Sequence, residues 1–538
     1  MNDASAEDHD NDPPASLTPE EARVWQAFRE GSACDLRTGQ SGEDDLAIPV
    51  IGGRQRSVRA WVVERLLLDG PTALPGHVAS LKLRGAEITG TLDLSGRTVA
   101  PYVQLVGCRF EQELRVSGAR FTTLLLNGCS MPRLEGAGVH VEEALMLTQC
   151  DFRDGIRLTD ARVGTDLLLY ASQVSADKPG PCVAAAGIRV GRDLGADLME
   201  ARGEVHLHGA TIGGSLSMRG CALQNLEVYG GLNAPRMTVG RTLDLSALKS
   251  GDRAHPGGLQ AIPFRCFNGI RLDDGRFGAI DLESAQISLV GEQELSLRRV
   301  VAQELRYTRE RQQYGDRVVL SDARVGNLAD SAGSWPERGR LFLDGFVYDK
   351  LVPVDDFTVE QRLAWLAVAT PAYLPQPYEQ LAEAYRRGGH GRAVSQVRRT
   401  QRQRALLPWA ARAWQVFRDA PGAAVALWAV AVVALLVVAW LSTRAFLAGT
   451  GGGGARLGPS DAPPAVLAVV SILSASGVLI GGVLGGLAKF VRARGQNTSD
   501  LVRAQAEMTR AEADMLRARA GLPSVEGPAL PAAPGGEE

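Results

Sequence analysis

The 538-residue chain is poor in aromatic residues and carries almost no net charge. Phe, Trp and Tyr make up 6% of the sequence, and the formal net charge at pH 7 is −3. A nucleic-acid binder that works through bulk charge needs an excess of Lys and Arg, so we expect no nucleic-acid partner. Residues 1–16 are acidic and polar, without an apolar run. They lack the pattern of a secretory signal peptide, and we interpret them as a disordered acidic tail.

Cysteine is also scarce. The chain has seven cysteines, an odd number in a long sequence, which argues against a disulfide framework. Cys108, Cys129 and Cys150 are spaced 21 residues apart, and we interpret them as one core position in successive repeats. Metal ligands must converge on one point, whereas stacked repeats place equivalent side chains along a line, about 4.8 Å apart. The spacing therefore favours core packing over a metal site.

Motifs for cofactors and catalysis are missing. The sequence contains no Walker A motif, no H-E-x-x-H and no G-x-S-x-G nucleophile turn. Gly187, Gly191 and Gly195 lack the spacing of a dinucleotide-binding loop. We therefore predict no catalytic, cofactor-binding or metal-binding residues, and we favour a protein that is not an enzyme.

Two groups of polar residues have spacings that could suit chemistry. His206 and His208 flank Leu207, so both are expected on one outer face, but no third metal ligand is identifiable. Surface histidines are the preferred interpretation. β-Helix enzymes that cleave polysaccharides use paired carboxylates. The candidates for such a pair are Asp193, Asp197, Asp273 and Asp274. Acids on the outer turns of a repeat are usually solvated, so we assign no active site to them.

Glycine is abundant, with 61 residues, and an apolar motif recurs through residues 78–128. Its apolar residues occur in pairs two positions apart, the spacing of a strand with one buried face. The pairs are Leu81/Leu83, Leu92/Leu94, Val103/Leu105, Leu114/Val116 and Leu124/Leu126. They recur about every 11 residues, so two pairs make a coil of about 21–22 residues. Short strands, turn glycines and a fixed repeat predict a mainly β fold, a β-solenoid.

The repeat predicts a solenoid over residues 77–350, with roughly a dozen coils. Residues 17–76 precede it, and we predict that they form a helical cap over the open first coil. The helices expected in this cap cover residues 18–29 and 58–68. Polar insertions at 175–181 and 249–258 interrupt the repeat and are expected to leave the solenoid as loops.

The period changes after residue 350, and residues 351–420 are expected to form a basic helical linker. The helices expected there cover residues 359–369, 377–387 and 393–417, the last kinked or interrupted at Pro408. Between Arg386 and Arg418 there are nine arginines and no acid. This composition is typical of a segment that sets membrane topology and contacts lipid headgroups.

Two long runs without charge follow the linker. Residues 421–443 and 462–488 contain no charged residue, and both exceed the roughly 20 residues that cross a bilayer. We predict transmembrane helices over 421–447 and 462–490, joined by an extracytoplasmic loop at 448–461. The basic flanks then place the solenoid and both termini in the cytoplasm, on the inner face of the plasma membrane. Two buried helices of a soluble core are the alternative.

The last part of the chain has two patterns that suit helix packing. Gly477, Gly481 and Gly485 are spaced by four, which allows close packing of helices within one chain or between chains. Residues 491–520 are predicted to form a cytoplasmic helix, and residues 521–538 a disordered tail. A heptad pattern in this helix predicts a short coiled coil, with a solvated amphipathic helix as the alternative. Its core positions are Leu501, Ala504, Met508, Ala511, Met515 and Ala518.

Several of these motifs together resemble those of a known group of proteins. The motifs are T-P-E-E (18–21), D-L-R-T-G (35–39), V-R-A (58–60), L-K-L-R-G-A-E-I-T-G-T-L-D-L-S-G (81–96), P-Y-E-Q-L-A (377–382) and G-H (389–390). The chain resembles actinobacterial pentapeptide-like β-solenoid membrane proteins, which are often labelled "membrane-associated oxidoreductase". The resemblance covers nearly the whole chain and implies a solenoid ahead of two membrane spans. It supplies no catalytic residues.

These observations predict a membrane-anchored scaffold or protein-interaction module on the cytoplasmic face. A long repetitive surface, an anchor and a lack of catalytic motifs favour this function. The expected partners are the lipid bilayer and an unidentified protein, with a homo-oligomer left open, and no cofactor is expected. The alternatives are an oxidoreductase, as the family label implies, and a membrane effector whose two spans oligomerise.

Overall fold

The computed structural model describes part of the chain. The described residues are 14, 16–39, 56–176, 180–225, 230–249, 261–289, 293–308, 317–336, 340–355, 357–369 and 373–419. They belong to a compact unit that comprises residues 1–419. The predicted acidic tail up to residue 13, both apolar runs, the glycines at 477, 481 and 485 and the heptad positions 501–518 lie outside the described residues.

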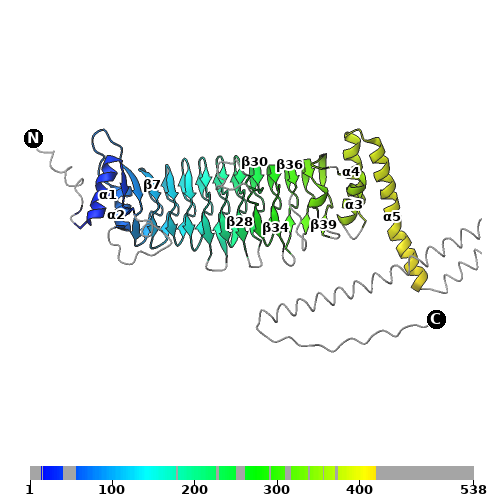
Figure 1. Ribbon diagram of the computed structural model, residues 1–538, viewed down its shortest axis with the longest axis horizontal. Coiled ribbons are helices and arrows are strands. Elements are labelled where there is room, and N and C mark those ends of the chain that lie inside the picture. Colours follow the sequence, from blue (N-terminus) through cyan, green and yellow to red (C-terminus); the bar gives the residue numbers. More distant parts are fainter. Residues whose placement is uncertain are drawn as a thin grey trace, which may run out of the picture. The chain divides into compact units, whose positions relative to one another are not determined.

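The described chain forms a β-solenoid of about 11 coils, which confirms the predicted mainly β solenoid (Figure 1). Its strands form three sheets of 19, 10 and 11 strands, here named sheets A, B and C, and neighbouring coils pair in parallel. Leu124 lies opposite Leu145 in the next coil, and Leu145 lies opposite Leu167. These steps of 21 and 22 residues confirm the predicted length of a coil.

The strands are short, and most coils contribute to every sheet. Sheet A contains β1 (Ala33–Asp35), β3 (Ser80–Arg84), β6 (Thr98–Val99), β7 (Tyr102–Val106), β10 (Arg120–Phe121), β11 (Leu124–Asn127), β14 (His140–Val141), β15 (Leu145–Thr148), β18 (Arg162–Val163), β19 (Leu167–Leu168), β22 (Arg189–Val190), β23 (Leu194–Gly195), β26 (Thr211–Ile212), β27 (Leu216–Ser217), β30 (Thr238–Asp244), β33 (Arg276–Asp281), β36 (Val301–Tyr307), β38 (Arg324–Asp330) and β40 (Val347–Pro353). Sheet B contains β2 (Ser57–Arg59), β4 (Glu87–Thr89), β8 (Arg109–Phe110), β12 (Ser130–Met131), β16 (Asp151–Phe152), β20 (Gln173–Ser175), β24 (Glu200–Arg202), β28 (Ala222–Gln224), β31 (Arg265–Phe267) and β34 (Gln286–Ser288). Sheet C contains β5 (Leu92–Asp93), β9 (Leu114–Arg115), β13 (Leu134–Glu135), β17 (Ile156–Arg157), β21 (Pro181–Ala184), β25 (Glu204–His206), β29 (Leu232–Asn233), β32 (Ile270–Arg271), β35 (Leu295–Ser296), β37 (Val318–Val319) and β39 (Leu341–Phe342).

Sheet A consists of two rows of strands, so a coil has four faces. The β6 row contains β6, β10, β14, β18, β22 and β26, and the β7 row contains β7, β11, β15, β19, β23 and β27. From β30 onward one long strand continues both rows. Residues that alternate along each strand point inward and outward, which fixes the register of each coil on the next.

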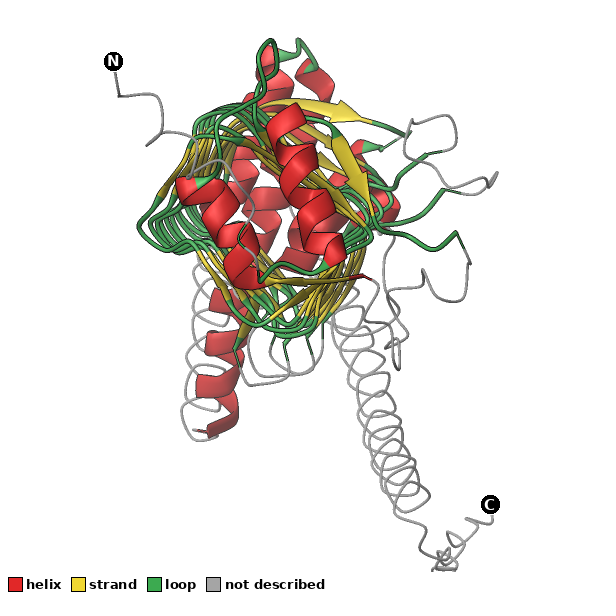
Figure 2. Ribbon diagram, turned by 90° about the vertical axis from the view of Figure 1, so that its left-hand side faces the viewer, coloured by secondary structure: helices red, strands yellow, loops and turns green. Residues whose placement is uncertain are grey.

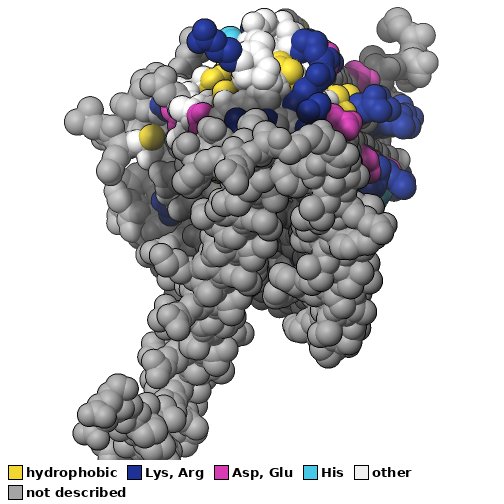
Figure 3. Space-filling model, turned by 90° about the vertical axis from the view of Figure 1, so that its right-hand side faces the viewer, with side chains coloured by type: hydrophobic (Ala, Val, Ile, Leu, Met, Phe, Trp, Pro, Cys, Tyr) yellow, Lys and Arg dark blue, Asp and Glu magenta, His cyan; other side chains and the backbone are white. Residues whose placement is uncertain are grey.

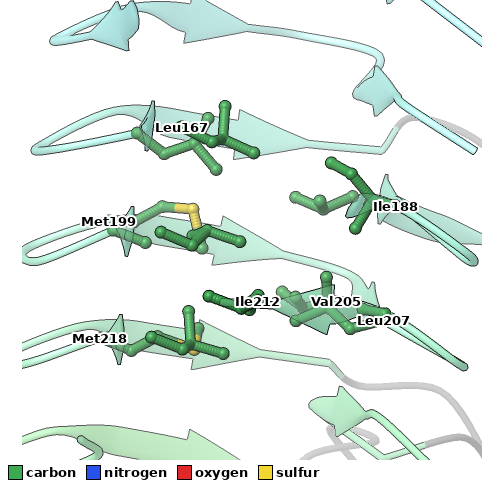
Figure 4. Packing of buried hydrophobic residues seen from close by; sticks show 14 of the residues in the cluster. Leu167, Ile188, Met199, Val205, Leu207, Ile212 and Met218 are labelled. Atoms are coloured by element: carbon green, nitrogen blue, oxygen red, sulfur yellow. The ribbon is translucent and has the colours of Figure 1, made fainter. Parts of the chain in front are cut away.

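The interior is filled by the apolar pairs that define the repeat. All ten residues of the pairs from Leu81 to Leu126 are buried. Figure 4 shows the same arrangement farther along, where Leu167, Met199, Val205, Ile212 and Met218 of successive coils point into the interior. Burying one such side chain stabilises the fold by about 1.5–3 kcal/mol. The core therefore runs without interruption through the stacked coils.

Each coil enters the β6 row through one residue in the left-handed backbone region. Gly96 has φ 68°, Gly118 has φ 64° and Gly138 has φ 67°. Glycine adopts this region without the cost of about 1–2 kcal/mol that other residues incur. In two later coils the residue with this left-handed conformation is Asp160 or Arg236, which incurs that cost. Within the described coils, six glycines occupy this corner: Gly96, Gly118, Gly138, Gly187, Gly209 and Gly345.

Strands and helices cover the first coil. α1 (Pro19–Glu30) and α2 (Ala60–Asp69) lie across this end of the solenoid (Figure 2). β1 pairs with β3, and β2 pairs with β4, so the first coil finds hydrogen-bond partners in sheets A and B. Two helices thus occur close to the positions predicted for the helical cap. Its second helix starts two residues later than expected because Ser57–Arg59 forms β2.

Three helices follow the last coil: α3 (Val359–Ala369), α4 (Pro375–Arg387) and α5 (Gly391–Asp419). α3 matches its predicted bounds. α5 was expected to be kinked or interrupted at Pro408, but the helix continues past this residue, so the hydrogen bond that proline removes does not end it. None of the helices within residues 14–419 that the structure describes is long and apolar enough to cross a membrane.

The two predicted insertions fall at connections between sheets. One lies between β20 and β21, and the other lies between β30 and β31. Residues 177–179 and 250–260 within them lie outside the described residues.

Glu21 ties α1 to the start of α2. Its fully buried carboxylate accepts hydrogen bonds from the Thr18 backbone N–H and from both the backbone and the guanidinium of Arg59. Burial alone would raise the pKa of Glu21, but the hydrogen bonds from Arg59 and Thr18 outweigh it and hold this pKa below its ordinary value. The ionised carboxylate therefore stabilises the cap.

We expect the cap to loosen in acid. A carboxyl group whose pKa is lowered by folding stabilises the protein above its unfolded pKa of about 4.3, and this contribution is lost as pH falls through the folded pKa. The protection factors of the α1 amides, which correct for the intrinsic pH dependence of exchange, should therefore fall below about pH 4. In Glu21→Gln the protection factors should be lower at neutral pH and nearly independent of acid. Equal acid sensitivity in both proteins would contradict the role of Glu21.

Candidate interaction site

The three cysteines spaced by 21 residues stack in adjacent coils. Cys108, Cys129 and Cys150 are buried, and each thiol donates to a backbone carbonyl oxygen of the preceding coil, at 3.4–3.6 Å. Burial raises the pKa of two other cysteines, Cys182 and Cys266, to about 12. Neutral, buried thiols pack as small apolar groups. The prediction of core packing is confirmed for these residues.

His206 at the end of β25 and His208 in the turn that follows have ring centroids 6.3 Å apart. Sequence reasoning missed Glu204, which lies two residues before His206 on the same strand. Its Oε1 is 3.1 Å from His206 Nδ1 and also accepts a hydrogen bond from Asn233. Burial would raise the pKa of Glu204, but these hydrogen bonds lower it on balance. Within the described ranges, no group of three or more His, Cys, Asp or Glu residues is suited to hold a metal ion.

The four aspartates proposed as carboxylate candidates do not form one site. Asp193 and Asp197 flank β23 on sheet A, whereas Asp273 and Asp274 follow β32 on sheet C. Each carboxylate pairs with arginine instead. The pairs are Asp193–Arg241, Asp197–Arg219, Asp273–Arg271, Asp273–Arg298 and Asp274–Arg299. A glycosidase needs one carboxyl group with a raised pKa, but a backbone hydrogen bond from Ser215 lowers the pKa of Asp193, and Arg299 lowers that of Asp274.

Charged side chains on the outside of sheet C neutralise one another. Asp93, Arg115 and Glu135 occupy equivalent positions in successive coils, so acid and base alternate. Arg115 lies 2.5 Å from Glu113 and 3.9 Å from Asp93. A self-paired row of this kind presents little net charge to a partner.

The outside of the β6 row differs. One position of successive coils holds Arg120, His140, Arg162 and Arg189, and the same position holds Arg276 and Arg324 farther along. We name these six residues the arginine row. Its five arginine side chains are exposed, and none forms a hydrogen bond or an ion pair with another described residue. At the usual separation of about 4.8 Å between strands, the row extends over about 38 Å.

Bare backbone borders the arginine row. Gly164 and Gly191 lie two residues beyond Arg162 and Arg189, and Gly213 occupies the same position in the next coil. A Cβ atom on Gly164 would overlap the Glu142 carbonyl oxygen, and one on Gly191 would overlap the Gly164 carbonyl oxygen. Close approach of the coils thus requires glycine here. Side chains are consequently absent beside these arginines, which leaves their guanidinium groups accessible.

Sequence reasoning missed the arginine row, although a signal is present. Four of its arginines follow a small or branched apolar residue and precede Phe or Val, as in Ala119-Arg120-Phe121 and Ile188-Arg189-Val190. The apolar neighbours point inward, so the arginine between them must point outward. Aligning coils by this tripeptide would have shown the row.

A buried ion pair fastens the helices to the last coils. Asp330 ends β38, and both of its carboxylate oxygens accept from the Arg362 guanidinium on α3, at 2.5 and 2.6 Å. The two side chains are 0% and 1% exposed. Trp335 Nε1 also donates to Asp330, at 2.9 Å, and the Arg362 guanidinium lies 3.6 Å from the centre of the Phe357 ring.

α4 then covers part of the last strand edge. Gln376 Nε2 donates to the Phe346 carbonyl oxygen at 3.0 Å, and Gln380 Nε2 donates to the Tyr348 carbonyl oxygen at 2.5 Å. Four residues of a helix rise about 6.0 Å, and two residues of a strand rise about 6.6 Å, so the two spacings nearly match. At these two carbonyl groups, the glutamine side-chain amides supply the hydrogen bonds that the backbone N–H groups of a further coil would donate.

No protein-family model, curated protein or solved structure matches this chain.

We expect Asp330→Ala to destabilise the C-terminal end of the solenoid by about 3–5 kcal/mol, because it leaves Arg362 charged and buried without a partner. The double variant Asp330→Leu/Arg362→Met should recover most of the loss. Thermal unfolding followed by circular dichroism tests both. Asp274→Asn removes the charge of an exposed pair, keeps a side chain that tolerates the left-handed backbone there (φ 60°), and should leave the melting temperature unchanged. An Asp330→Ala protein that melts like wild type would refute the importance of this pair.

Proposed function

We propose that the protein is a non-enzymatic, membrane-tethered scaffold that binds an acidic protein partner along the arginine row. The observation that supports this function is the row itself. Most other arginines on the outer faces of sheets A and C pair with a neighbouring acid or carbonyl group, whereas these five, at one position of the repeat, form no hydrogen bond or ion pair with a described residue.

The physical character of the row suits reversible binding. An exposed ion pair contributes about 0.2–1 kcal/mol, so five together give a few kcal/mol at most. Their main effect is to speed encounter with a negatively charged surface and to orient it. We therefore expect an interaction that weakens strongly with salt, because the Debye length is about 8 Å at physiological ionic strength.

The tether is the second part of the proposal. The uncharged runs at 421–443 and 462–488 follow the basic α5, and arginines concentrated before a span favour the cytoplasmic side. The solenoid is then held at the inner face of the plasma membrane. Tethering raises the local concentration of a partner's binding surface without any new contact.

We expect Arg120→Glu/Arg162→Glu/Arg189→Glu to abolish partner binding. The variant turns three unpaired cations into anions, which repel an acidic surface. Affinity capture from membranes of the source cells, with quantitative mass spectrometry, compares this variant with wild type. Proteins that require the row should fall at least tenfold.

The matched control is Arg153→Glu/Arg202→Glu/Arg265→Glu. It makes the same charge change at three exposed arginines, two in strands of sheet B and one directly after such a strand. It should keep the partners that the first variant loses, and raising the salt concentration should release them from wild type. Capture that survives the first variant, or that is lost equally in both, would rule out the arginine row as the binding surface.

Removing residues 421–490 should release the protein from the membrane fraction. In the full-length protein, high salt and carbonate washes should fail to extract it, because apolar spans do not depend on ion pairs. Carbonate extraction of the full-length chain would contradict the tether while leaving the arginine-row test intact.

A further inference from the structure

A cavity of about 590 Å³ lies beside the last strand of the solenoid. One wall is the second half of β40, from Asp349 to Pro353, and the other is the C-terminal end of α4 with His390 beyond it. This part of the β40 edge lies past the two carbonyl groups that Gln376 and Gln380 cover. Lys and Arg side chains stand out on the described surface at this end of the solenoid (Figure 3).

Several donor side chains of the cavity form no hydrogen bond with a described residue. The Lys350 ammonium and the Tyr385 hydroxyl form no hydrogen bond with a described residue, and neither does the His390 ring, which packs edge-on against Tyr385. Burial raises the pKa of Tyr385, so its hydroxyl remains a donor at neutral pH. Asp349 is the acidic residue among the described residues that line the cavity. Its carboxylate already pairs with Arg387, at 3.0 Å.

The rest of the wall is apolar. Leu351, Pro353, Phe357 and Ala384 line the cavity together with these donors. The buried Arg362 also reaches it, but its charge is balanced by Asp330. A volume of about 300–1,000 Å³ with apolar walls and a few convergent polar groups is typical of a small-molecule site.

We infer that this cavity binds a small amphipathic anion, a phosphate monoester or carboxylate joined to an apolar group. The anionic end accepts from Lys350, Tyr385 and His390, and the apolar end packs against Leu351, Pro353 and Phe357. The site is held in shape without the ligand, because the Asp330–Arg362 pair fixes α3 and the glutamines fix α4. The chemistry fits either a soluble metabolite or the headgroup region of an acidic lipid.

Isothermal titration of the full-length chain in phosphatidylcholine nanodiscs with hexyl phosphate tests the inference. Hexyl phosphate should bind at least tenfold more tightly than inorganic phosphate, which lacks the apolar group, and than hexanol, which lacks the charge. Lys350→Met should weaken hexyl phosphate binding about tenfold, as expected for a lost charge-assisted hydrogen bond. Tyr385→Phe removes only the hydroxyl and should weaken binding severalfold.

Lys249→Met is the matched control, because Lys249 pairs with Glu283 far from the cavity, and it should bind like wild type. Repeating the titration in nanodiscs that contain phosphatidic acid distinguishes an acidic lipid from a soluble metabolite as the natural ligand. Loss of hexyl phosphate binding there points to a lipid headgroup, and unchanged binding points to a soluble ligand. Binding that is equal in wild type, Lys350→Met and Tyr385→Phe, or equal for hexyl phosphate and inorganic phosphate, would overturn the inference. None of these outcomes depends on the arginine row.

Discussion

The hydrogen bonds between coils are the interaction on which this molecule depends, because each coil completes its backbone pairing only through its neighbours. Such a stack has two open ends, and an uncovered end exposes both unpaired strand edges and apolar core. The two ends meet this constraint differently. At the first coil, β1 and β2 continue the pairing as strands. At the last coil, glutamine side chains from α4 take over two carbonyl groups, and the buried Asp330–Arg362 pair holds the helices in place.

The incomplete cover at the last coil is what creates a site there. A helix can match a strand edge over two side-chain contacts, but its rise of about 1.5 Å per residue soon departs from the strand's 3.3 Å. Beyond Tyr348 the long Arg387 side chain still reaches Asp349, and α4 then ends at Gly388. The cavity beside Lys350 and Tyr385 is thus a geometric consequence of capping a sheet with a helix. Its polar lining is specific to this chain.

Stacking at a fixed repeat also determines how charged side chains on the outer faces interact with one another. Any side chain at a given position lies about 4.8 Å from its equivalents, so like charges in a row repel and alternating charges attract. Sheet C follows the favourable pattern with Asp93, Arg115 and Glu135. The β6 row retains five arginines without compensation, at a cost to stability that nothing within the described residues offsets. An unfavourable row that the fold does not need is more readily explained by a partner than by folding.

The sequence was sufficient to predict the features that depend only on the period of its apolar residues. Apolar pairs two residues apart gave the solenoid, its coil length and its buried cysteines, and the capping box at Thr18 gave the first helix. The remainder depends on which coils lie opposite one another. Insertions after β20 and β30 change the count between coils, so the arginine row follows from its repeated tripeptide and not from a fixed spacing. The link between Asp330 and Arg362, 32 residues apart, joins the last coils to a helix outside the repeat, so the repeat does not predict it. The acids at 193, 197, 273 and 274 were expected to be solvated on outer turns, but Asp197 and Asp273 are buried, and the arginine partners of the four lie mainly in other coils. Local spacing therefore determines the coil, and the order of coils determines the surfaces through which the solenoid can act.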